Sequence, residues 1–204
     1  MNKIERFIKL PWADKKLILR KMFMMPVLKN GYGHIGTGSC IEKALAIRGK
    51  EHIYIGNYTF IRPGARIECV TEFAGKQYSP RLVIGNSVNV EQNVHIVCAT
   101  ELNIDDDVTI SSGVFISDNS HQFDIVPGSV LKTPLKTEAT YIGKGAFIGV
   151  GAKIMQGVTI GKNVIIGANA VVTKSIPDYS IAVGVPAKVI KQYDFEKKKW
   201  ISVD

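Results

Sequence analysis

Residues 142–172 read IGKGAFIGVGAKIMQGVTIGKNVIIGANAVV, and an aliphatic residue returns in them at every sixth position. These positions are Ile142, Ile148, Ile154, Ile160, Ile166 and Val172. A smaller apolar residue stands four positions after each of the first five. Helices and flat strands have periods of 3.6 and 2.0, so neither produces a period of six. Strands broken by bends do, and three such units close a triangular coil that stacks on its neighbours at roughly 4.8 Å as parallel strands.

The same period continues upstream, where further aliphatic triplets begin at Ile35, Ile55, Ile84 and Ile104. Together with the triplets from 142 and 160, the chain is predicted to form about six coils. The spacing departs from six only between one triplet and the next, with gaps of 8, 17, 8, 26 and 6 residues. All insertions therefore leave the prism at one corner. The two long ones, residues 68–83 and 117–141, are the loops where function is expected, because a rigid scaffold commonly carries function on its loops.

The stretch IGKGAFIGVGAKIMQGVTIGKNVIIGANAVVTKSIPDYSIAVGVPAKVIK (142–191) resembles the hexapeptide-repeat acetyltransferases, as does VFISDNSH (114–121). The chain is similar to galactoside and maltose acetyltransferases and to surface-polysaccharide O-acetyltransferases over roughly residues 30–191. The resemblance implies an all-β fold, a left-handed parallel β-helix. The left hand rests on the resemblance alone, because parallel crossovers are otherwise right-handed. The resemblance also implies a homotrimer with active sites between subunits.

Three segments are expected: a helical cap at residues 1–30, the β-helix acetyltransferase domain at 31–187 and a basic tail at 188–204, in which YDFEKKKW (193–200) is expected to be exposed. The net charge is +8, and it is concentrated at the two ends, because residues 31–187 contain as many acidic as basic side chains. A nucleic-acid-binding protein would carry a basic stripe along its body, so nucleic acid is not expected as a partner. Cationic ends suit a phosphate-bearing cofactor or a membrane surface.

The N-terminal segment ADKKLILRKMFMM (13–25) predicts a short helix that begins at Asp14. We interpret it as a cap on the open edge of the first coil; the alternative is docking on a membrane that presents a lipid-linked glycan. No apolar stretch approaches the roughly 20 residues of a membrane-spanning helix. The three cysteines form no CxxC pair, which is typical of a reducing compartment. A cytoplasmic protein is expected, with peripheral contact at the inner face of the membrane as the alternative.

His121 lies in the 117–141 loop, at the position of the family's catalytic histidine. An imidazole with a pKa near 6.5 can take the proton of an acceptor hydroxyl as its oxygen attacks a thioester. Asp118 and Asn119 are candidates to orient the ring, although both residue types also stabilise turns. By resemblance, Asn93 and Glu91 are candidate acceptor contacts; the family has asparagine where Glu91 stands. A structural role for Asn93 at a corner with left-handed φ is the alternative.

The resemblance also implies a site for acetyl-CoA, the co-substrate. Val150 and Ala168 would flank the pantetheine arm, and four residues would lie nearer the phosphorylated nucleotide. These are Thr173, Lys174, Lys188 and Lys191. Basic side chains at these positions suit phosphate groups. No metal is expected: a zinc site of the carbonic anhydrase type needs three histidines, and the chain has only His34, His52, His95 and His121, without suitable spacing.

We therefore predict acetyl transfer from acetyl-CoA to a hydroxyl of a sugar or surface-polysaccharide precursor, with His121 as the base. The alternatives are N-acetylation of an amino-sugar nucleotide and O-acetylation of an antibiotic. A β-helix scaffold without activity is the non-enzymatic alternative. The identity of the acceptor and the role of loop 68–83 remain open from the sequence.

Overall fold

The structure is a computed structural model that describes residues 11–12, 15, 30–122 and 129–203. It divides into two units, Met1–Gly31 and Tyr32–Asp204, and the second unit contains the β-helix. The helix predicted within residues 13–25 and its role as a cap lie outside the described residues, apart from Lys15. Within the described ranges, no helix is long and apolar enough to cross a membrane.

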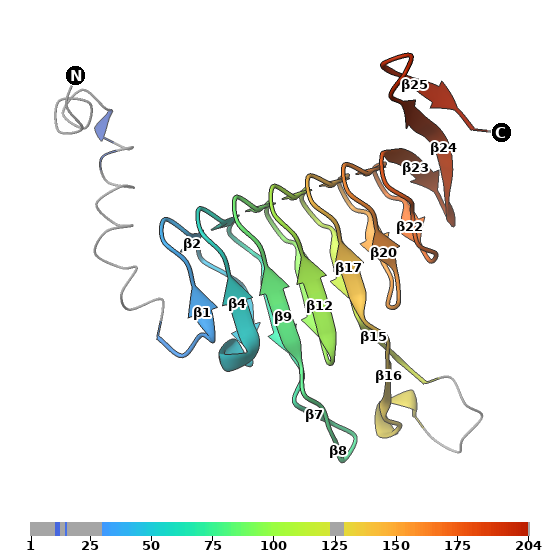
Figure 1. The fold of residues 1–204 in the computed structure, drawn as a ribbon. Helices are drawn as coiled ribbons and strands as arrows, with labels where there is room; N and C mark the ends of the chain where they lie inside the picture. The colour runs from blue at the N-terminus through green and yellow to red at the C-terminus, as the bar shows by residue number, and fades with distance from the viewer. Residues whose placement is uncertain (1–10, 13–14, 16–29, 123–128, 204) are drawn as a thin grey trace. The chain divides into compact units, whose positions relative to one another are not determined.

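Six coils each contribute one strand to each of three parallel sheets, as Figure 1 shows. Sheet A contains β1 (His34–Ile35), β4 (Ile53–Ile55), β9 (Arg81–Ile84), β12 (Glu101–Ile104), β17 (Thr140–Ile142) and β20 (Thr159–Ile160). Sheet B contains β2 (Cys40–Ile41), β5 (Phe60–Ile61), β10 (Asn89–Val90), β13 (Thr109–Ile110), β18 (Phe147–Ile148) and β21 (Ile165–Ile166). Sheet C contains β3 (Ala46–Arg48), β6 (Arg66–Cys69), β11 (His95–Cys98), β14 (Phe115–Ser117), β19 (Lys153–Ile154) and β22 (Val171–Val172).

The strand register confirms the six-residue period. In sheet A, Ile104 pairs with Ile84 on one side and with Ile142 on the other. The corresponding aliphatic positions of sheets B and C pair in the same way, for example Ile110 with Ile148. These side chains fill the interior of the prism, and Ile110 and Ile148 are completely buried. The expected parallel β-helix is therefore confirmed.

The corner between sheets A and B is closed by a ladder of side chains that bind the coil before them. Asn57 Oδ1 accepts a hydrogen bond of 2.8 Å from the backbone N–H of Thr37. Asn86 Oδ1 binds the N–H of Asn57 in the same way, and Asp106 Oδ1 binds that of Asn86. Backbone N–H groups that the bends would leave unpaired thus donate hydrogen bonds to side-chain oxygens of the next coil.

All insertions leave the prism at the corner between sheets C and A, as the spacing predicts. The first is the short η1 helix (Lys50–His52). The second is the hairpin of β7 (Glu72–Phe73) and β8 (Lys76–Gln77), and the third is the short connection between β11 and β12. The fourth is the hairpin of β15 (Asn119–His121) and β16 (Leu135–Thr137), with η2 (Val130–Lys132) between its strands. Figure 1 shows both hairpins extending from the same edge of the prism.

In the C-terminal region, predicted as a basic tail at 188–204, the chain continues as strands, and most side chains of residues 193–200 are exposed as expected. The strands β23 (Ser180–Gly184), β24 (Ala187–Asp194) and β25 (Lys199–Ser202) extend sheet B, with β24 and β25 antiparallel. The physical reason is a cluster of aromatic rings: the centroid of Tyr193 lies 5.1 Å from that of Phe195 and 5.4 Å from that of Trp200. These ring contacts, in which Phe195 remains 60% exposed, help to order a segment whose lysines made it look solvated.

We expect Gly149→Ala to destabilise the fold. A Cβ at Gly149 would lie 2.6 Å from the carbonyl oxygen of Ile166 and 2.7 Å from the backbone nitrogen of Ala168, so adjacent coils would be pushed apart. Such overpacking costs about 1–3 kcal/mol, which urea denaturation would measure. Leu45→Ala, at a side chain that is 75% exposed, is the control and should change stability little. Equal stability of Gly149→Ala and wild type would contradict the close coil contact.

Candidate active site

His121 lies at the end of β15, where antiparallel pairing with Leu135 of β16 fixes its backbone. Its ring is tilted by 51° against that of Phe73, with the centroids 5.3 Å apart. The ring nitrogen Nδ1 is buried and has no hydrogen-bond partner among the residues that the structure describes. The imidazole is therefore held by packing and by its backbone, and Nε2 is the nitrogen left for contact with a ligand.

The hairpin of β7 and β8 also contacts the His121 hairpin through Tyr78. The backbone N–H of Leu135 donates a hydrogen bond of 2.6 Å to the hydroxyl of Tyr78. Together with the Phe73 ring, this bond joins loop 68–83 to the strand pair that carries His121. The sequence indicated that loop 68–83 matters but not how; the structure shows that it holds the His121 hairpin from a different coil.

A pocket of about 440 Å³ lies between the two hairpins and the outer face of sheet C. Arg66, His95 and Phe115 follow one another in register on neighbouring strands, and all three line it. Phe73 and His121 line it from the hairpins. His95 packs in the wall beside Phe115, since their ring centroids are 5.3 Å apart in an edge-to-face arrangement.

Glu68 is the centre of a charged cluster in this pocket that sequence reasoning missed. Its side chain is 10% exposed, and Oε2 accepts a hydrogen bond of 2.5 Å from Nε of Arg66. Nε2 of His95 lies 3.3 Å from the same oxygen, and Nη1 of Arg48 lies 3.5 Å from Oε1. Burial alone would raise the pKa of Glu68, but these hydrogen bonds and positive charges outweigh it and lower the pKa.

Asp118 is completely buried at the root of the His121 hairpin. Oδ1 accepts a hydrogen bond of 2.7 Å from the backbone N–H of Ala99, and Oδ2 accepts one of 2.8 Å from that of Thr100. Asn119 Nδ2 donates to Oδ1 of Asp118 at 2.9 Å. A buried carboxylate requires such donors. Both candidate orienting groups therefore bind each other and the preceding coil, and they fix the hairpin rather than the imidazole ring.

Glu91 and Asn93 lie at the corner between sheets B and C, whereas His121 leaves the corner between sheets C and A. Glu91 Oε1 is 3.6 Å from Nε of Arg62. Asn93 has a φ of 58°, and its Oδ1 fills the space where Gly64 lacks a side chain. Asn93 thus has the structural role at a corner that was the alternative to acceptor binding. Within one chain, neither Glu91 nor Asn93 lies beside His121.

The candidate CoA residues also fall into separate groups. Val150 and Ala168 occupy equivalent turns of adjacent coils at the corner between sheets B and C, and the N–H of Asn169 donates to the carbonyl of Val150 at 2.8 Å. Val150 is 49% exposed. Thr173 and Lys174 follow β22 at the corner between sheets C and A. The remaining two, Lys188 and Lys191, are exposed on β24.

Cys98 is buried below Asp118, and its Sγ donates to Oδ2 of Asp118 at 3.3 Å. Hydrogen bonding with Cys69, burial and the nearby charge of Asp118 raise the pKa of the Cys98 thiol. A thiol in this state is a poor nucleophile, so Cys98 has a packing role. Within the described part of the chain, no group of three or more His, Cys, Asp or Glu side chains is arranged to hold a metal ion.

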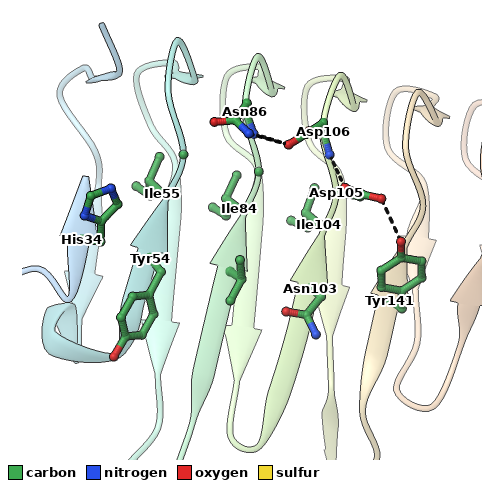
Figure 2. A pocket seen from close by; sticks show the side chains of 13 residues that line it. His34, Tyr54, Ile55, Ile84, Asn86, Asn103, Ile104, Asp105, Asp106 and Tyr141 are labelled. Atoms are coloured by element: carbon green, nitrogen blue, oxygen red, sulfur yellow. Dashed lines mark hydrogen bonds between the residues drawn. The ribbon is translucent and has the colours of Figure 1, made fainter. Parts of the chain in front are cut away.

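A second pocket, of about 500 Å³, lies on the outer face of sheet A (Figure 2). Its polar groups are already engaged within the fold: Asp106 binds Asn86, and the Tyr141 hydroxyl donates to Oδ2 of Asp105 at 2.9 Å. His34 lies on the first coil and Tyr141 on the fifth. The reactive side chains that line this pocket are therefore spread over several coils and do not converge on one place where a substrate could react. The pocket beside His121 is therefore the better candidate for chemistry.

We expect Tyr78→Phe to loosen the His121 hairpin. The substitution removes the hydroxyl that accepts from the Leu135 N–H, and an unpaired, partly buried donor costs about 1–3 kcal/mol. Hydrogen exchange at the Leu135 amide should become faster than in wild type. Tyr58→Phe, at a ring that is 62% exposed, is the matched control and should leave this exchange unchanged. Unaltered exchange in Tyr78→Phe would show that the contact does not hold the hairpin.

Comparisons with known proteins agree with this architecture. Residues 139–174 match the family model of the bacterial transferase hexapeptide (six repeats). WbbJ of Escherichia coli K12, whose name assigns it to lipopolysaccharide biosynthesis as an O-acetyl transferase, is 34% identical over 127 residues. The match covers 58% of this chain and 64% of WbbJ, so it spans less than two thirds of that relative.

Among solved structures, a variant of AntD, an N-acyltransferase from Bacillus cereus in complex with dTDP and coenzyme A, superposes with a TM-score of 0.69. It is 24% identical, and the match covers 85% of this chain and 90% of AntD. A maltose O-acetyltransferase from Clostridium difficile 630 has a TM-score of 0.54 and 24% identity, with 83% and 74% of the two chains covered. The acetyltransferase VCA0836 of Vibrio cholerae, complexed with acetyl-CoA, also has a TM-score of 0.54. It is 22% identical, and the match covers 94% of this chain and 83% of VCA0836. The chain is thus similar to the hexapeptide-repeat transferases, whose family model matches residues 139–174, and it has a left-handed parallel β-helix fold.

Proposed function

We propose that this protein transfers an acetyl group from acetyl-CoA to a hydroxyl of a sugar on a surface-polysaccharide precursor, with His121 as general base. The observation that carries the proposal is the position of His121: two hairpins from different coils hold its ring at the edge of a pocket. A solvated loop histidine would need neither contact. The name of WbbJ and the coenzyme A bound to AntD and VCA0836 support the same class of reaction.

In the proposed reaction, Nε2 of His121 takes the proton of the acceptor hydroxyl while its oxygen attacks the thioester carbonyl carbon. Backbone N–H groups stabilise the tetrahedral oxyanion. The carbon–sulfur bond then breaks, and the imidazolium returns the proton to the CoA sulfur. The products are an acetyl ester and free CoA. Transfer is direct, because the Cys98 thiol is buried and hydrogen-bonded to Asp118.

The groups proposed to hold acetyl-CoA fit its chemistry. Val150 is exposed and apolar, and with Ala168 it forms a continuous surface across two coils for the pantetheine arm. Lys188 and Lys191 are exposed cations on β24, and Lys174 is a third one after β22. Lysine ammonium groups bind phosphate as point charges. These residues would therefore bind the two ends of the molecule, while His121 acts at the thioester.

A homotrimer with the active site between neighbouring copies fits this arrangement. One chain places His121 and Lys174 at the corner between sheets C and A, but Glu91, Asn93 and Val150 at the corner between sheets B and C. A second copy that presents its other corner would complete the site. We expect sedimentation equilibrium to give three times the chain mass of 22.4 kDa. A monomer with full activity would contradict an intersubunit site.

We expect His121→Ala to abolish turnover while acetyl-CoA still binds. Loss of a general base lowers kcat on the order of 10²–10⁴-fold. The measurement is thiol release from acetyl-CoA against a panel of sugars, amino-sugar nucleotides and lipid-linked glycans, with mass spectrometry of the acetylated atom. His52→Ala is the matched control, since His52 lies at the same corner on another coil and should be dispensable.

The possible outcomes separate the alternatives. Acetylation of a hydroxyl that depends on His121 supports the proposal. Acetylation of an amine alone would replace it with N-acetylation, as in an amino-sugar pathway. Full turnover in His121→Ala, or failure of the wild-type protein to bind acetyl-CoA, would reject the proposed mechanism.

A further inference from the structure

We propose that the pocket beside His121 recognises an anionic group of the acceptor, a carboxylate or a phosphate, through the guanidinium of Arg66, which Glu68 positions. The inference rests on the proposed function, because it specifies the class of acceptor. It follows from the charged cluster on sheet C.

The charge balance of the cluster leaves positive charge for a ligand. Among the residues that the structure describes, Glu68 is the only carboxylate that lines the pocket. Its Oε2 contacts Arg66 and His95, and its Oε1 faces Arg48. Arg48 does not line the pocket itself, but it lies on the other side of Glu68, so two arginines surround one carboxylate even when His95 is neutral. A ligand carboxylate or phosphate would meet a net positive charge, whereas a second cation would be repelled.

Arg66 has the geometry of an anion receptor rather than of a completed ion pair. It contacts Glu68 through Nε, and its side chain is 46% exposed. Its two terminal amino groups have no partner among the described residues, so they remain for a ligand. Planar guanidinium groups bind carboxylate and phosphate through two parallel hydrogen bonds.

Glu68 acts as the positioning residue of this receptor. It is only 7% exposed, so the anchor of the Arg66 side chain is itself fixed by the fold. An arginine that is already ordered loses less conformational entropy when a ligand binds. If the Arg66–Glu68 ion pair served only to stabilise the strand, the guanidinium of Arg66 would not need to be exposed to the pocket.

The position of Arg66 also constrains where the anion lies on the acceptor. Arg66 and Phe115 are two strands apart in sheet C, with His95 between them. Their backbones are therefore separated by roughly 10 Å along the prism. His121 follows the strand of Phe115, so the anionic group belongs to a part of the acceptor other than the reacting hydroxyl. The His95 and Phe115 rings form the surface between them.

The test compares matched acceptors: a neutral hexoside, the corresponding hexuronate and the corresponding hexose phosphate. With the wild-type protein we expect kcat/KM to be at least about tenfold higher for the anionic member that fits. Arg66→Gln should raise KM for the anionic acceptor much more than for the neutral hexoside and so remove this preference; Arg66→Lys should retain part of it. Arg81→Gln is the control, since Arg81 stacks on Tyr54 at sheet A. Preference for the hexuronate or for the hexose phosphate identifies which anion is bound.

Thermal unfolding checks that both Arg66 variants are folded, and calorimetry of the same ligands gives a second readout that needs no turnover. Equal kcat/KM for neutral and anionic acceptors in the wild type, or equal loss on both in Arg66→Gln, would overturn the inference while the acetyltransferase proposal stands. If no acceptor is turned over, the proposed function fails. The anion site is then judged by calorimetry alone, and equal anion affinity of wild type and Arg66→Gln overturns it.

Discussion

The structure depends on parallel backbone pairing between coils in one fixed register. Each inward aliphatic side chain stacks on its equivalent in the next coil, as Ile104 does between Ile84 and Ile142. A slip of one residue would turn the aliphatic side chains outward, so burial of the interior fixes the register. The register in turn fixes which outward side chains are neighbours. The row of Arg66, His95 and Phe115, and therefore the wall of the pocket, follows directly from the packing of the core.

The functional loops are positioned by contacts between coils rather than within them. Asp118 binds the backbone of residues 99–100 and so anchors the root of the His121 hairpin on the preceding coil. Tyr78 and Phe73 reach the same hairpin from two coils away. A histidine in the 25-residue segment 117–141 would otherwise be free to move, and general base catalysis requires it within hydrogen-bond reach of the acceptor. The rigid prism and the two interacting hairpins supply that restraint.

Most of the fold and part of the candidate site could be predicted from the sequence. The six-residue period identifies each inward position, and the spacing between triplets places His121 and loop 68–83 at one corner. The Glu68 cluster was not predicted: the period shows that Arg66 and Glu68 flank the inward Ile67 and point outward, but not that Glu68 is nearly buried by its contacts with Arg66, His95 and Arg48. The six-residue register does place Arg66 beside His95 on neighbouring strands, so this contact could have been predicted from the sequence. The strands β24 and β25 were missed because they lack the six-residue period and are ordered by aromatic contacts around Tyr193.

The central claim is that chemistry takes place beside His121, with acetyl-CoA bound between that hairpin and the C-terminal coils. A crystal structure of the protein with coenzyme A tests it most directly. The account predicts that the thiol sulfur lies beside the imidazole of His121, with the pantetheine arm along Val150 and Ala168 and the phosphates near the lysines of β24. A thiol located in the pocket on sheet A, between Tyr54 and Tyr141, would contradict the account.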